Sequence, residues 1–158
     1  MIRLNPILPQ HPALNVEEFE RAIENALTGL AEDIRVDFEV TAQTWVNKPA
    51  FKIDKRPFER DIYTESEIYS YVARGTRPHV ILPKIAPALR FRPTYKAKTR
   101  PRYIGSTGGG ASGPFVTARV VHHPGTEARD FERVIAEKWQ KLWPNIMQRA
   151  IASEVQHR

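Results

Sequence analysis

Apolar side chains recur every three or four residues through the first third of the chain, which is the spacing of one face of a helix. The apolar positions are Val16, Phe19, Ile23, Leu27, Leu30, Ile34, Phe38 and Trp45, with Thr41 at the missing step. Asn15 and Glu18 match a capping box at the start, and Pro49 closes the segment. The pattern predicts a helix over residues 16–46, about 46 Å long at 1.5 Å per residue.

The period changes in the middle of the chain, where apolar and polar residues alternate. Alternation over residues 51–56 and 60–64 predicts an antiparallel hairpin. A short helix is expected over residues 66–73, with Ser66 as its N-cap and Gly75 just beyond its C-terminus.

Further strands are predicted over residues 79–82, 88–92 and 115–122, the last of which is rich in β-branched residues. Residues 94–114 contain basic and glycine-rich runs. Since a loop of about 20 residues is uncommon inside a compact domain, we expect a mobile loop with a function of its own.

A second apolar stripe begins near residue 128 and predicts a C-terminal helix. Pro144 lies inside it and lacks an amide donor, so it should kink the helix or split it in two. The predicted fold class is α+β, with a long N-terminal amphipathic helix and a C-terminal helix packed on one face of a small antiparallel β-sheet. Residues 15–158 would form this single domain, preceded by an extended, proline-rich N-terminal arm over residues 1–14.

Charge is unevenly distributed along the 158 residues, although the formal net charge is only +6. Residues 1–67 carry 13 acidic and 8 basic residues, whereas residues 68–126 carry ten Lys or Arg and no Asp or Glu. Such asymmetry points to a charged partner, either nucleic acid or another protein surface, and the simpler alternative is a basic face that keeps the protein soluble. The chain also lacks a long apolar run and a signal-peptide pattern, so we expect a soluble protein made in the cytoplasm without a membrane partner.

The residues offer little material for catalysis. Cysteine is absent, which excludes disulfides and thiolate sites. The glycine-rich segment 105–113 lacks the Lys, the following Ser or Thr and the helix that a P-loop needs. His122 and His123 would point to opposite faces of a strand, so they and His79 make a poor metal site. We therefore expect no enzyme activity, no metal and no cofactor, and a small hydrolase that uses His123 is the weakest alternative.

Basic and aromatic residues are interleaved over residues 90–103. Lys and Arg would neutralise phosphates while Tyr95 and Tyr103 stack on bases, which favours a nucleic-acid-binding module. The same segment could instead meet the acidic first helix of a neighbouring copy in a closed ring. The candidate interface residues are Glu17, Glu20, Glu24, Arg92, Lys96, Lys98, Arg100, Arg102 and Tyr103.

Two motifs resemble those of a known family. Residues 71–79 (Tyr-Val-Ala-Arg-Gly-Thr-Arg-Pro-His) are followed by Ile-Leu-Pro-Lys and Ala-Leu-Arg-Phe, and residues 123–131 begin His-Pro-Gly-Thr and end in Phe. In this order they resemble the minor tail-component, or neck and tail-completion, proteins of lambdoid tailed phages. The motif residues are Gly75, Thr76, His79, His123, Pro124, Gly125, Thr126 and Phe131. Each also suits an architectural role, such as a positive φ, a turn or a helix cap.

The resemblance implies a structural protein of a virion, located at the head–tail junction or upper tail. It implies a ring, six- or twelve-fold, that connects head-completion proteins to the tail. The expected partners are copies of the chain itself and neighbouring neck, tail-terminator or tail-tube proteins, with DNA passing through the lumen.

Overall fold

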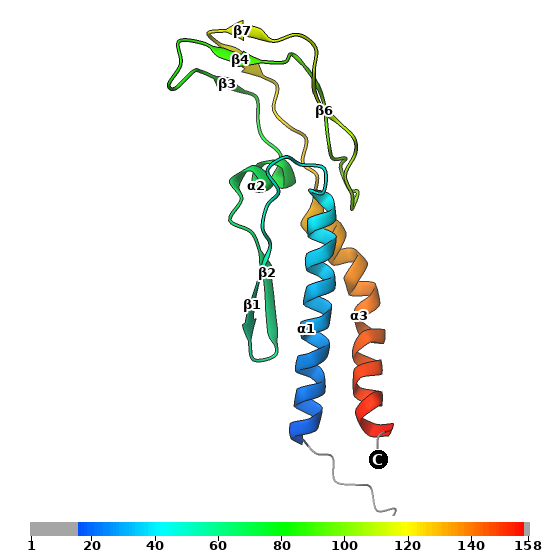
Figure 1. The fold of residues 1–158 in the computed structure, drawn as a ribbon. Coiled ribbons are helices and arrows are strands. Elements are labelled where there is room, and N and C mark those ends of the chain that lie inside the picture. Colours follow the sequence, from blue (N-terminus) through cyan, green and yellow to red (C-terminus); the bar gives the residue numbers. More distant parts are fainter. Residues whose placement is uncertain (1–15, 157–158) are drawn as a thin grey trace, which may run out of the picture.

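A computed structural model of the chain describes residues 16–156, which form three helices and eight short strands. The helices are α1 (Val16–Thr41), α2 (Glu67–Arg74) and α3 (Phe131–Gln156). Helices α1 and α3 lie side by side, and most of the strands gather beyond one end of this pair (Figure 1). The α+β class is confirmed. The predicted arm over residues 1–14 lies outside the described residues.

The strands pair only in twos, and all four pairs are antiparallel. The strands are β1 (Lys52–Arg56), β2 (Glu59–Tyr63), β3 (His79–Ile81), β4 (Leu89–Phe91), β5 (Thr94–Lys96), β6 (Gly110–Ser112), β7 (Val116–Ala118) and β8 (Val121–His123). The ladders are β1–β2, β3–β8, β4–β7 and β5–β6, so the single sheet with helices on one face is not formed. Six of these strands are three residues long, because prolines such as Pro83, Pro87 and Pro93 interrupt the ladders by lacking an amide donor.

Residues 94–114, which were expected to form a loop, instead contain a two-stranded ladder and a hydrogen-bonded turn. The ends of this segment pair as β5 and β6, and its turn is fastened by hydrogen bonds from the Thr107 amide to the Lys98 carbonyl at 2.6 Å and from the Thr107 hydroxyl to the Ala97 carbonyl at 2.8 Å. A Cβ on Gly109 would run into the backbone of Ala97. Glycine is therefore needed here for close backbone approach, which the sequence pattern does not distinguish from flexibility.

Two predicted boundaries need correction, and one of the two outcomes expected at Pro144, the split, does not occur. Helix α1 ends at Thr41, where the chain tightens into a turn that brings Trp45 back against the core. The strand predicted over residues 115–122 is divided into β7 and β8. Helix α3 continues through the exposed Pro144 without being split, since one missing amide donor still leaves the flanking turns bonded.

Other expectations are confirmed. The β1–β2 hairpin forms in the predicted place, and the Ser66 hydroxyl caps α2 by accepting a hydrogen bond from the Tyr69 amide at 3.2 Å. Gly75 ends the helix with φ of 76°.

A small aromatic core joins α1, α2 and α3. The Tyr69 ring lies 5.0 Å from the Phe51 ring and 5.4 Å from the Phe131 ring, measured between centroids. Burial raises the pKa of the Tyr69 phenol, whose oxygen lies 3.0 Å from the Thr41 hydroxyl. No helix among residues 16–156 is long and apolar enough to cross a membrane.

Candidate functional site

The two segments that carry the family resemblance meet at one place in the structure. The Thr76 amide donates to the Thr126 carbonyl at 2.9 Å, and the Thr126 amide donates back to the Thr76 carbonyl at 3.0 Å. This exchange lies where the chain passes from the helices to the outer strands. It forms a junction between two motifs that are 50 residues apart in the sequence.

Glycine is required on both sides of this junction. Gly75 and Gly125 have φ of 76° and 91°, a region that residues with a Cβ rarely adopt. A Cβ on Gly75 would lie 2.6 Å from the Thr126 carbonyl oxygen, and one on Gly125 would lie even closer to that of Thr76. The paired glycines let the two backbones approach closely enough for the exchanged hydrogen bonds.

The remaining motif residues extend the junction in both directions. His79 and His123 are opposite each other in the β3–β8 ladder, with their rings stacked at 4.9 Å between centroids. The His123 Nδ1 accepts a hydrogen bond from the Gly125 amide at 3.0 Å, which closes the turn that includes Pro124. Phe131 is fully buried at the start of α3. The structure thus brings the motif together as architecture.

Arg129 is a junction residue that the sequence analysis missed. Its amide donates to the Ala73 carbonyl at 3.0 Å and so satisfies the C-terminus of α2. Its buried guanidinium donates from Nε to the Thr99 hydroxyl at 3.2 Å and lies 3.8 Å from the Glu127 carboxylate. A single basic residue beside a turn gives no sequence signal that distinguishes it from a surface charge.

Beyond the junction, residues 79–123 form what we call the strand lobe, which contains β3 to β8 (Figure 1). Many of its large apolar side chains are exposed. They are Val80, Ile81, Leu82, Ile85, Tyr95, Tyr103, Phe115 and Val120. Ile85, in the turn between β3 and β4, is fully exposed.

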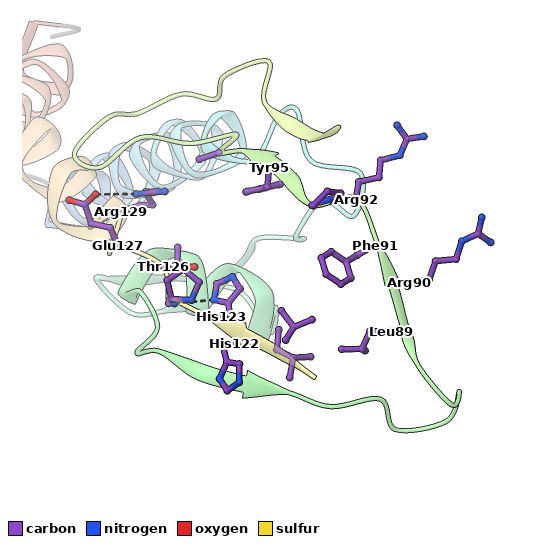
Figure 2. A pocket seen from close by; sticks show the side chains of 16 residues that line it. Leu89, Arg90, Phe91, Arg92, Tyr95, His122, His123, Thr126, Glu127 and Arg129 are labelled. Carbon is purple, nitrogen blue, oxygen red and sulfur yellow. Dashed lines mark hydrogen bonds and ion pairs between the residues drawn. The ribbon is translucent and has the colours of Figure 1, made fainter. Parts of the chain in front are cut away.

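An open cleft of about 710 Å³ lies on the inner side of the strand lobe. Figure 2 shows Leu89, Phe91 and Tyr95 pointing into it from β4 and β5, opposite the strand that carries His122 and His123. Ile81 and Val121 also line it. The cleft is therefore mainly apolar at its centre.

The predicted acidic interface residues lie on α1, away from the strand lobe. Glu17 and Glu20 are in the first turns of the helix, at the end opposite the lobe (Figure 1). Glu24 is used within the chain, because its carboxylate accepts a hydrogen bond from the Phe58 amide at 2.6 Å and pairs with Arg60. The Phe58 hydrogen bond, followed by that of Arg60, lowers the pKa of Glu24. Glu24 thus links α1 to the β1–β2 hairpin within the chain, and its role in an intermolecular contact stays a prediction.

The predicted basic interface residues all lie in the strand lobe. The Arg92 guanidinium lies over the Phe115 ring, and the Lys98 ammonium donates to the Thr44 carbonyl at 3.0 Å, which ties the lobe to the end of α1. The exposed residues of the set are Arg92, Lys96, Arg100, Arg102 and Tyr103. The acidic and basic sets are thus held apart within one chain.

Residues that could bind a metal or perform acid–base chemistry are scattered. Within residues 16–156 no group of three or more His, Cys, Asp or Glu side chains is placed to hold a metal ion. His79 and His123 form a pair at the junction, and each Nδ1 atom already has a backbone partner. The His79 Nδ1 lies 2.8 Å from the Arg77 carbonyl oxygen, and the His123 Nδ1 accepts from the Gly125 amide.

Comparisons of the chain with protein-family models, with curated proteins and with solved structures find no match in any of the three.

Proposed function

We propose that this chain is a structural subunit of a tailed-phage virion, which assembles into a ring at the head–tail junction. The observation that carries the proposal is the strand lobe. Its strands pair only in twos, and its large apolar side chains are uncovered. An isolated two-stranded ladder is marginally stable in water, and contiguous exposed apolar surface marks sites of protein association.

In the proposed ring, a neighbouring copy of the chain covers this surface. In the particle, the ring then contacts neck or tail proteins. The apolar cleft of about 710 Å³ and the exposed tip around Ile85 offer two different surfaces on the same lobe. Contact between two different surfaces is heterologous, and it gives a closed ring when the rotation between copies closes. A six- or twelve-fold ring is the stoichiometry that the family resemblance favours.

The junction supports the same role. The residues of the two phage-like motifs, 71–79 and 123–131, form a tight connection between the helical pair and the strand lobe. A firm connection would hold the assembly surface in a fixed direction relative to α1 and α3. The proposal assigns the chain no catalytic step, and its place of action is the virion.

The test of this role is the composition of particles. In phage particles produced from the genome that encodes the chain, mass spectrometry should detect the chain at a fixed copy number per virion. Disruption of its gene should leave heads and tails unjoined, and the intact gene supplied in trans should restore joined particles. Particles that are complete and infectious without the chain would overturn the proposal.

A further inference from the structure

The positive charge of the strand lobe has no counter-charge within the described part of the chain. The lobe carries eight Lys or Arg and no Asp or Glu, and its basic residues are Lys84, Arg90, Arg92, Lys96, Lys98, Arg100, Arg102 and Arg119. The ion pairs formed among residues 16–156 all use cations outside the lobe. The lobe therefore presents uncompensated positive charge.

In the β4–β7 ladder, the positively charged side chains lie on one face. Figure 2 shows Leu89 and Phe91 pointing into the cleft. Arg90 and Arg92 border the same cleft, but their guanidinium groups extend away from it. In the ladder Arg90 is opposite Thr117. Because side chains alternate along a strand, the ladder has an apolar inner face and a basic outer face.

Phe115 holds the two arginines of the outer face in place. The Cζ atoms of Arg90 and Arg92 lie 4.6 Å and 4.8 Å from the centroid of its ring. Phe115 is about half exposed, so this cluster is at the surface. A guanidinium that stacks on a ring keeps its N–H edges free to donate to an anion, and it loses less side-chain freedom on binding. We call Arg90, Arg92, Phe115 and Thr117 the arginine face.

We propose that the arginine face binds the phosphate backbone of duplex DNA. Guanidinium groups match phosphate oxygens in a forked, two-bond geometry, and the other lobe cations would add to the attraction along the duplex. An acidic surface of a second copy is the weaker partner, because α1 carboxylates such as Glu24 and Asp37 are already paired with Arg60 and Lys138. The contact is to the backbone and reads no base sequence.

The test uses the purified full-length chain and a fluorescein-labelled duplex of arbitrary sequence, about 20 base pairs long, in fluorescence anisotropy at salt from about 50 to 200 mM. R90Q/R92Q should weaken binding by about tenfold and reduce the slope of log affinity against log salt by about two. The matched control is K141Q/R149Q, which removes the same charge from exposed positions on α3 and should retain wild-type affinity to within about twofold.

Phe115 supplies a second, independent measurement. F115L keeps an apolar side chain but removes the ring, and it should weaken binding several-fold, whereas F115Y should bind as the wild type does. Equal melting temperatures of F115L and F115Y would confirm that both variants are folded. Wild-type protein that fails to bind the duplex at about 50 mM salt would overturn the inference. Equal losses in R90Q/R92Q and K141Q/R149Q would do the same.

A change of oligomeric mass in R90Q/R92Q, with DNA affinity unchanged, would also overturn the inference, and it would assign the arginine face to an acidic protein surface. DNA affinity is measured on the isolated protein and does not depend on incorporation into particles. Failure of DNA binding therefore leaves the ring proposal standing, and failure of incorporation leaves the DNA site standing.

Discussion

At the scale of single residues, Gly75 and Gly125 carry the most demanding backbone positions of the junction. Both have positive φ, and both lie against the carbonyl oxygen of a threonine across the junction. Neither requirement can be met by moving a flexible side chain, because the obstacle is backbone. The junction is therefore sensitive to the smallest possible substitution.

Gly75→Ala should destabilise the fold by more than about 1 kcal/mol, because the added Cβ is strained by the positive φ and by the Thr126 carbonyl oxygen. Thermal or urea unfolding measures the effect. Gly29→Ala is the matched control, since Gly29 is helical with open space around it, and it should stabilise α1 by up to about 1 kcal/mol. Equal stability of the Gly75→Ala variant and the wild type would show that the junction is not constrained as described.

Glu24 should make stability depend on acid pH. Hydrogen bonds from the Phe58 amide and Arg60 lower its pKa from the ordinary value of 4.5. A lowered pKa in the folded state means that this stabilisation is present above the unfolded pKa and is lost as pH falls through the folded pKa. Melting temperatures of Glu24→Gln should therefore fall less than those of the wild type below about pH 4.5.

Glu20→Gln provides the comparison for Glu24→Gln, because it removes an exposed carboxylate one turn earlier on α1. Its melting temperatures should follow the wild-type pH profile. If Glu24→Gln also follows that profile, the link between α1 and the β1–β2 hairpin contributes nothing to the acid sensitivity.

At the scale of elements, one carboxylate fastens α1 to α3. Asp37 accepts hydrogen bonds from the Trp139 Nε1 at 2.7 Å and from the Lys138 ammonium at 2.6 Å, and its side chain is only 14% exposed. Two donors on consecutive residues of α3 thus meet a single acceptor on α1. The contact fixes the register of the long helices.

Asp37→Ala should lower the free energy of unfolding by about 1–3 kcal/mol, because it leaves the half-buried Trp139 donor without its acceptor. Chemical denaturation followed by tryptophan fluorescence measures this change. Asp33→Ala, an exposed position one turn earlier on α1, should change stability by less than about 0.5 kcal/mol. Similar losses in the two variants would contradict the assigned role of Asp37.

Elements with local signals could be predicted from the sequence, whereas those that depend on distant contacts could not. The apolar stripe of α1, the Ser66 cap and the β1–β2 alternation all act within a few residues, and each was predicted correctly. The pairing of β5 with β6 depends on the Thr107 turn and on close backbone approach at Gly109. The sequence shows these residues only as a polar, glycine-rich run.

The candidate site was predictable in part for the same reason. The motif residues around Gly75 and Gly125 were identified from the sequence. The contact between the two motifs depends on the tertiary fold, so the sequence did not predict it. The acidic residue Glu24 was assigned to a partner because its own partner, Arg60, is distant in the sequence. Exposure of Ile85 could not be foreseen, since an apolar residue between prolines is equally compatible with a buried turn.

At the scale of the whole molecule, the chain has a narrow pair of helices with a small core at one end and an open strand lobe beyond it (Figure 1). The core is built around Tyr69, while the lobe exposes apolar residues such as Leu82 and Ile85. In the assembled ring these residues would be covered by a neighbouring copy. Their contribution is then to association rather than to the stability of the single chain.

The double variant Leu82→Glu/Ile85→Glu should weaken association while leaving the unfolding free energy of the single chain within about 0.5 kcal/mol of the wild type, because both side chains are exposed. Sedimentation velocity over a range of protein concentrations measures the loss. Val46→Glu, an exposed apolar position outside the strand lobe, should associate as the wild type does. Loss of association in Val46→Glu but not in the double variant would move the interface away from the lobe.

The most direct test of the assembly account is the mass of the purified full-length protein in solution, measured by native mass spectrometry and light scattering. The account predicts a discrete closed oligomer, six- or twelve-fold, of the 18.1 kDa chain, and its conversion to single chains by Leu82→Glu/Ile85→Glu. A wild-type protein that remains at 18.1 kDa at every concentration, alone and with neck or tail proteins, would contradict it.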